Sequence, residues 1–178
     1  MAQMQQAKDV GSVDPIAGLL EFARELERAC ACLQGEAKTG WSEAIAFIDA
    51  RAPLYLRDLE QAVLPLLKKH VRDDSEDEAA LAQTLMKLTD ELAEIEARWR
   101  VLRPALVGAR PADRNTRLAE PIAEYVELWE AHVAMMENDV IPALHARLDP
   151  NEMDSVAHAL ALHRGVGWNV QAEDTSHP

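Results

Sequence analysis

Apolar residues recur along the chain at steps of three and four, the spacing that places them on one face of a helix. Four runs have this spacing: Leu19, Phe22, Leu26, Cys30 and Leu33; Ile48, Ala52, Tyr55, Leu59, Val63 and Leu66; Leu81, Leu85, Leu88, Leu92, Ile95, Trp99 and Leu102; and Ile122, Tyr125, Trp129, His132, Met136 and Val140. The sequence contains no strand-like alternation with hairpin turns. The pattern predicts an all-α protein whose long helices each bury one apolar face.

Capping residues and prolines indicate where the predicted helices begin and end. Asp14 followed by Pro15 is typical of a helix start, and Ser75 with Glu78 three residues later has the capping-box spacing. Asp149 is followed by Pro150, as at a helix start, and by Glu152 at the capping-box spacing. We expect Pro53 to kink the second helix and Pro104 to bend or fray the end of the third. The predicted helices cover about 15–33, 41–71, 75–107, 117–148 and 150–163.

Four long helices with short connections favour an up-down-up-down four-helix bundle, here followed by a short fifth helix. The length of 178 residues is that of one ordinary domain with a real core. We expect one domain over residues 14–165, with flexible tails at 1–13 and 166–178. Polar clusters around 35–40, 72–74 and 108–116 would form the connections.

Composition and charge narrow the class of function. Hydrophobic residues make up 48% of the chain and charged residues 28%, a globular balance. With 18 basic and 31 acidic residues the net charge is −13, which argues against nucleic acid and anionic membranes as partners. Cys30 and Cys32 lie too close for a normal disulfide within one helix, and the sequence lacks a membrane span and a signal peptide. These features predict a cytoplasmic protein.

Two segments of the chain share a frame in which a proline follows ten residues after a ring-bearing side chain. One segment runs from Tyr55 to Pro65 and the other from His132 to Pro142. In this frame the sequence resembles the hemerythrin-like (HHE cation-binding) family, whose bundle helices carry a His, an acidic residue four or five positions on, and an apolar-Pro ending. The resemblance covers roughly residues 14–165. It implies a hemerythrin-like bundle with a di-iron centre that binds dioxygen or a related small ligand.

This sequence departs from the family pattern at most of the implied ligand positions. The lost ligand positions are Phe22, Leu59, Leu92 and Met136, and Tyr55 stands where a His is expected. The residual metal-ligand candidates are Glu96, His132, Glu137 and Tyr55. All five substituted positions also lie on the predicted core faces, where each large apolar side chain stabilises the fold by about 1.5–3 kcal/mol. We therefore expect a bundle whose metal site has been refilled by packing.

The retained polar residues have two interpretations each. His132 is either the last ligand of a weak metal site or a neutral core imidazole hydrogen-bonded to Glu96 or Tyr55, as buried polar groups usually are. Glu137 either turns inward as a ligand or faces solvent beside Asn138 and Asp139. His158 and His163 lie five residues apart and so do not converge on one helix face.

Two functional hypotheses follow. The first is a non-catalytic binding or regulatory bundle without a cofactor, which acts through its acidic surface or an unknown protein partner, as a monomer or weak homo-oligomer. The second is a residual binder of iron, another divalent metal or a small ligand that senses oxygen, nitric oxide or redox state. No serine lies in a nucleophile-elbow or phosphate-loop pattern, so we do not expect an enzyme.

Overall fold

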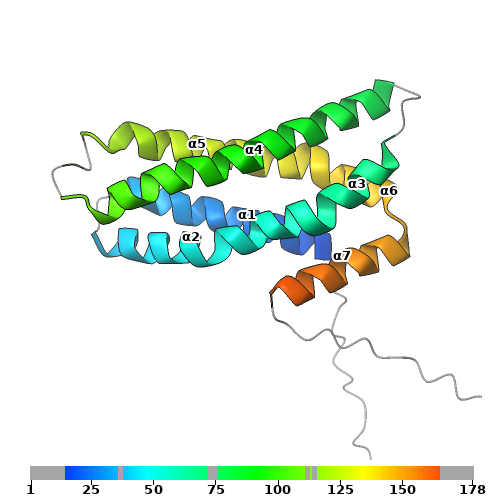
Figure 1. Ribbon diagram of the computed structural model, residues 1–178, viewed down its shortest axis with the longest axis horizontal. Helices are drawn as coiled ribbons and strands as arrows, with labels where there is room; N and C mark the ends of the chain where they lie inside the picture. The colour runs from blue at the N-terminus through cyan, green and yellow to red at the C-terminus, as the bar shows by residue number, and fades with distance from the viewer. Residues whose placement is uncertain (1–14, 36–37, 72–75, 111–112, 114–115, 165–178) are drawn as a thin grey trace, which may run out of the picture.

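The computed structural model describes residues 15–35, 38–71, 76–110, 113 and 116–164. Within these ranges the regular elements are helical and none is a strand, which confirms the all-α prediction for this part of the chain (Figure 1). The predicted tails at 1–13 and 166–178 lie outside the described residues, as does the predicted cap Ser75. The hemerythrin-like up-down-up-down arrangement stays a prediction.

The helical segments follow the predicted boundaries within a few residues. They are α1 (Pro15–Ala31) with the short 3-10 turn η1 (Cys32–Gln34); α2 (Lys38–Asp58), the π-helical turn η2 (Leu59–Val63) and α3 (Leu64–His70); α4 (Glu76–Val107); α5 (Ala119–Met135), the π-helical turn η4 (Met136–Val140) and α6 (Ile141–Arg147); and α7 (Pro150–His163). Two of the four predicted long helices are thus interrupted by a π turn.

The long helices lie side by side around a shared apolar core. Helix α1 contacts α2 on one side and α5 on the other, and α4 contacts α5 as well as α2 and α3. Figure 1 shows these rods running roughly along the long axis, with α7 set apart near the end where α3 and α6 lie. The four predicted apolar faces supply most of the buried core. The hydrophobic pattern therefore predicted the core correctly.

Both π turns end two residues before a proline. The Leu64 N–H donates to the Leu59 carbonyl and the Ile141 N–H to the Met136 carbonyl, five residues back instead of four. Pro65 and Pro142 are the second residues of the helices that follow. Because proline lacks an N–H and its ring clashes with the carbonyl four residues earlier, a regular α turn is disfavoured there. The wider turn accommodates the proline, and the helical segment continues beyond it.

The structure adds two details to the predicted helices and corrects one. Helix α2 is helical on both sides of Pro53, and the π turn lies ahead of Pro65. Helix α4 contains Pro104 and ends at Val107, as predicted. Leu66, predicted on the core face, is only half-buried, whereas Leu67 is fully buried. The cause of this last difference is that a π turn holds one residue more than an α turn, which shifts the buried face by one position.

Helix α7 is attached to the rest of the molecule by a buried carboxylate. Asp58, the last residue of α2, is fully buried and accepts a hydrogen bond from His163 Nδ1 at 2.9 Å. The same carboxylate accepts hydrogen bonds from Arg164 Nη2 and Nε at 2.9 and 3.1 Å. At the other end of α7, the predicted capping box of Asp149 and Glu152 is confirmed. The short helix is therefore tied down at both of its ends, since Glu152 also contacts His70 at 2.9 Å.

Candidate functional site

Three polar side chains from three different helices meet inside the core. Tyr55 extends from α2, His132 from α5 and Glu91 from α4. The Tyr55 hydroxyl lies 2.7 Å from His132 Nε2, and His132 Nδ1 lies 2.9 Å from Glu91 Oε2. Tyr55 and His132 are fully buried, and the Glu91 side chain is 10% exposed. We call these three residues the buried triad.

Hydrogen-bond chemistry determines the direction of both contacts in the triad. A carboxylate only accepts, so His132 Nδ1 carries the hydrogen that it donates to Glu91. In a neutral imidazole Nε2 then has a free lone pair, which accepts the hydrogen of the Tyr55 hydroxyl. Burial raises the pKa of Tyr55 well above its ordinary value of 10.0, and the negative charges of Glu91 and Asp58 raise it further. The phenol therefore keeps its proton, and beside a neutral imidazole it is the donor.

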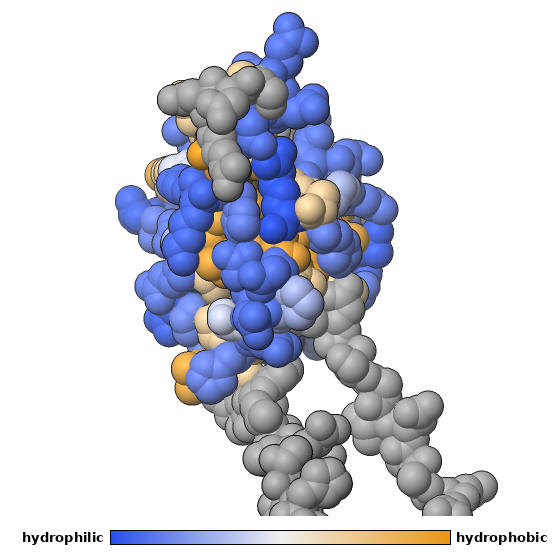
Figure 2. All heavy atoms as spheres, turned by 90° about the vertical axis from the view of Figure 1, so that its right-hand side faces the viewer, coloured by the Kyte–Doolittle hydropathy of each residue, from blue (hydrophilic) through white to orange (hydrophobic). Residues whose placement is uncertain are grey.

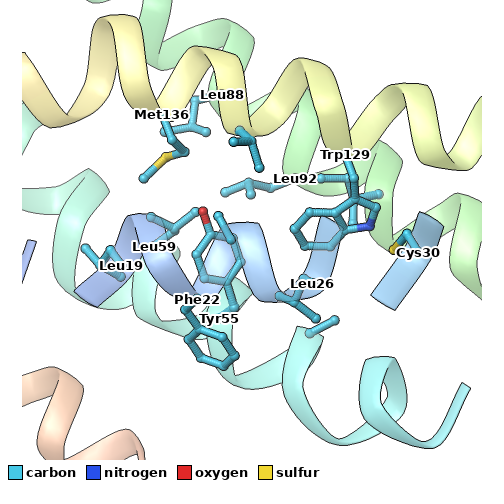
Figure 3. Close-up of a cluster of buried hydrophobic side chains, with 14 of the residues drawn as sticks. Leu19, Phe22, Leu26, Cys30, Tyr55, Leu59, Leu88, Leu92, Trp129 and Met136 are labelled. Atoms are coloured by element: carbon cyan, nitrogen blue, oxygen red, sulfur yellow. The ribbon is translucent and has the colours of Figure 1, made fainter. Parts of the chain in front are cut away.

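Apolar and aromatic side chains enclose the triad. The Phe22 ring packs edge-on against Tyr55, with centroids 5.5 Å apart. Trp129 lies 5.9 Å from Tyr55 and 5.5 Å from His132. Figure 3 shows Leu59, Leu92 and Met136 grouped around the Tyr55 hydroxyl, and these side chains, like Phe22, are buried. The prediction of an apolar midsection at Phe22, Leu59, Leu92 and Met136 is confirmed.

The two predicted carboxylate ligands lie on the outside of the molecule. The Glu96 side chain is 65% exposed and forms an ion pair with Arg100 at 3.3 Å. The Glu137 side chain is 51% exposed and accepts a hydrogen bond from Arg24 at 2.8 Å. The structure thus brings Tyr55 and His132 together and leaves Glu96 and Glu137 apart from them, so the solvent-facing interpretation of Glu137 is confirmed.

Glu91 is the residue that the sequence analysis missed. Tyr55 was a correct prediction for a partner of His132, but Glu96 was wrong, and Glu91 holds Nδ1 instead. A signal for this was present, because Glu91 lies three residues after Leu88 and four before Ile95, at the border of the buried face of α4. The resemblance to the family instead placed the ligand at Glu96, five residues further along the helix.

The side chains at the predicted metal level do not fit a di-iron centre. Four of the implied ligand positions hold Phe, Leu or Met side chains, which offer no nitrogen or oxygen donor. Among the described residues no three His, Cys, Asp or Glu side chains are grouped so that they could hold a metal ion. At the centre of the triad only one imidazole, one carboxylate and one phenol converge.

Two grooves open on the surface, away from the triad. One has a volume of about 410 Å³ between α3 and α4, lined by Lys68, Val71, Ala82, Leu85, Met86, Thr89 and Asp90. The other, of about 360 Å³, lies between the start of α2 and the end of α4, with Trp41 and Arg103 among its lining residues. Figure 2 views the end of the molecule with α3, α6 and α7, where hydrophilic side chains surround a few hydrophobic ones. The triad residues line neither groove.

Comparisons with known proteins leave the identity of the chain open. No protein-family model, curated protein or solved structure matches it. Among the described helices none has both the length and the apolar character needed to cross a bilayer. A functional proposal therefore depends on the chemistry of the buried triad and its surroundings.

Proposed function

We propose that the protein is a hemerythrin-like up-down-up-down four-helix bundle whose di-iron site has been replaced by packing, and that it is a non-catalytic binding or regulatory domain of the cytoplasm. In this proposal the bundle of the family is retained, while the binding of iron and of dioxygen is lost. The bundle acts through its acidic surface on a protein partner, as a monomer or weak homo-oligomer.

The observation that carries the proposal is the state of His132. Both of its ring nitrogens are engaged, one by the Tyr55 hydroxyl and the other by Glu91. A metal ion would have to displace one of these hydrogen bonds inside a core that offers no replacement partner. The apolar side chains at the neighbouring family positions support the same conclusion. They occupy the places of the implied ligands and offer a metal ion no nitrogen or oxygen atom.

The repeated frame of the two rods supports the hemerythrin-like part of the proposal. Tyr55 and His132 occupy equivalent places, each four residues ahead of the first residue of a π turn, and each π turn is followed by a helix with proline at its second position. The predicted correspondence from sequence spacing thus extends to the backbone. A pair of helices that presents equivalent side chains to the bundle axis is the arrangement that a two-metal site would need.

Elemental analysis tests the loss of the metal site. Protein produced in medium supplemented with iron, zinc and manganese is expected to be metal-free, and chelation is expected to leave its melting temperature unchanged. Near-stoichiometric metal that disappears in a His132→Ala variant would contradict the proposal.

Restoring donors tests the assignment of the lost positions. The double variant Leu59→Glu with Leu92→His should take up metal, because it returns a carboxylate and an imidazole beside His132. The matched control, Leu67→Glu with Leu81→His, introduces the same groups at other buried leucines and should take up none. If the first variant is folded by circular dichroism and as metal-free as the control, the assignment of Leu59 and Leu92 is wrong.

The second candidate is a residual metal or small-ligand site that senses oxygen, nitric oxide or redox state. One observation favours it: a phenol, an imidazole and a carboxylate lie in direct contact within one chain of hydrogen bonds. The donors would be Tyr55, His132 and Glu91, with Glu96 and Glu137 excluded by their outward pairing. This candidate predicts bound metal in the elemental analysis that is lost in Glu91→Gln as well as in His132→Ala.

A further inference from the structure

A series of aromatic rings leads from the buried triad to the surface. Tyr55 lies 5.9 Å from Trp129, measured between ring centroids. Trp129 is one helical turn from Tyr125 on α5, so the two side chains lie on the same helix face. Tyr125 stacks on Trp99 of α4, with centroids 5.3 Å apart. Trp99 is only partly buried, and its indole N–H donates to Asp49 at 2.9 Å.

Only the two ends of this series have an acceptor for a proton. The Tyr55 hydroxyl donates to His132, and the Trp99 indole donates to Asp49. The Tyr125 hydroxyl and the Trp129 indole nitrogen, in the middle, are buried and close to each other, and neither forms a hydrogen bond to a carboxylate or imidazole of the described residues. Loss of an electron from an aromatic ring makes its O–H or N–H strongly acidic, so an oxidised ring is stabilised where a base can take the proton. The middle rings can pass an electron but cannot hold the oxidised state.

We propose that Tyr55 is a redox-active tyrosine, which a high-potential one-electron oxidant at the surface oxidises through Trp99, Tyr125 and Trp129 while the phenolic proton moves to His132. The oxidant, such as an oxidising radical, is reduced by one electron. This redox role is independent of whether the bundle is hemerythrin-like.

The proton and the electron leave Tyr55 by different routes. The O–H bond of the phenol breaks and an N–H bond forms at His132 Nε2, over an oxygen-to-nitrogen distance of 2.7 Å. Tyr55 becomes a neutral radical and His132 an imidazolium, whose charge is balanced by the Glu91 carboxylate at 2.9 Å. On re-reduction by one electron the proton returns from Nε2 to the phenol oxygen. Before oxidation the triad carries the single negative charge of Glu91, and after oxidation that charge is paired with the imidazolium of His132, so the step leaves no unpaired positive charge in the core.

The surroundings of Tyr55 suit a radical that must persist. The side chain is fully buried, and apolar groups from three helices exclude water from its hydroxyl. Tyr125 differs, because that tyrosine is also buried but its hydroxyl donates no hydrogen bond to a base in the described part of the chain. A purely structural role for the triad requires only its hydrogen bonds. The redox role additionally requires the ring series that connects the triad to Trp99.

Flash photolysis of the full chain tests the proposal. A photo-oxidised ruthenium tris-bipyridine complex in solution serves as the oxidant, and transient absorption with freeze-quench electron paramagnetic resonance detects the radical. We expect a long-lived tyrosyl radical in the wild-type protein that forms more slowly in D2O, because the proton moves with the electron. The chain has 2 tyrosines, so the loss of this signal in Tyr55→Phe assigns it to one residue. A radical that survives in Tyr55→Phe would overturn the proposal.

Two substitutions at Trp99 test the route with a matched control. Trp99→Phe removes the oxidisable ring nearest the surface, and the Tyr55 radical yield should be lost. Trp99→Tyr keeps an oxidisable ring at the same place and should restore it. Equal yields in Trp99→Phe and the wild type would overturn the route.

The proton acceptor is tested by His132→Leu, in which the radical should no longer persist. If this variant is unfolded by circular dichroism, the D2O effect on the wild-type protein tests the same proton step. Identical rates in H2O and D2O would overturn it.

Discussion

At the scale of single residues, the two buried tyrosines form a natural comparison. Both rings are enclosed by the core, but only the Tyr55 hydroxyl donates to an imidazole, whereas the Tyr125 hydroxyl has no acceptor among the described residues and lies close to the indole of Trp129. A buried polar group costs free energy when it is left unpaired and little when it is paired. The same substitution at the two positions should therefore have opposite consequences.

We expect Tyr55→Phe to lower the free energy of unfolding by about 1–3 kcal/mol, because it leaves His132 Nε2 buried without a partner. Tyr125→Phe should be close to neutral or stabilising, since it removes a buried hydroxyl that has no acceptor for its proton within the described helices. Urea denaturation of both variants beside the wild type measures the difference. Equal destabilisation by the two substitutions would mean that the Tyr55 hydrogen bond contributes nothing to stability.

At the scale of elements, sequence periodicity predicted the helices well and their interruptions poorly. Steps of three and four residues identify a buried face, but a π turn inserts one residue without breaking the helix, so the pattern shifts where Leu67 replaces Leu66 in the core. A proline follows each of the two π turns. The sequence alone does not show which prolines accompany a π turn, since Pro53 lies inside a continuous helix and Pro65 follows a π turn.

The attachment of α7 could not be predicted from local signals either. Asp58 and Arg164 are 106 positions apart in the chain, and neither stands out from the many other charged residues. Arg164 also places its guanidinium 4.8 Å from the centroid of the Phe22 ring, a cation–π distance. Phe22 thus packs against Tyr55 in the core and against the residue that follows α7, and it links the two regions physically.

We expect Arg164→Ala to destabilise the α7 attachment by about 1–3 kcal/mol, because the buried Asp58 carboxylate loses two of its hydrogen bonds. Hydrogen exchange of the α7 amides should accelerate more than that of the α4 amides, since α7 would open locally. The control is Arg28→Ala, which removes an exposed ion pair with Glu21 and should leave the stability nearly unchanged, because solvent screens such a pair. Uniform acceleration in all helices would contradict a local role for Arg164.

At the scale of the whole molecule, the absence of metal ligands in the core was easier to predict from the sequence than the polar contacts that are present there. The apolar residues at the implied ligand positions are predictable, because each lies on a face with helical periodicity. The partner of His132 is harder to predict. The spacing places Glu91 at the border of the buried face of α4, but it does not say which side chain of α5 lies opposite.

The same burial that encloses the triad makes the stability of the whole fold sensitive to alkaline pH. Burial is the main cause that raises the pKa of Tyr55 and Tyr125 above the ordinary value of 10.0 and that of the Cys30 thiol above 9.0. In the unfolded chain these groups release their protons near their ordinary values, whereas the folded protein retains them. Above about pH 9 the folded state therefore binds more protons than the unfolded state, and the free energy of unfolding must fall as the pH rises.

Each of the three groups should contribute a slope of up to about 1.4 kcal/mol per pH unit once the pH exceeds its ordinary pKa. Urea midpoints measured from pH 8 upward should thus stay level at first, decline as the thiol ionises in the unfolded chain, and decline more steeply as the phenols follow. Tyr55→Phe and Tyr125→Phe should each flatten the steep part. Phe22→Leu, which alters a buried ring that does not titrate, should shift the midpoints and leave the slope unchanged. A slope in Tyr55→Phe as steep as in the wild type would mean that the phenol is not held protonated by burial.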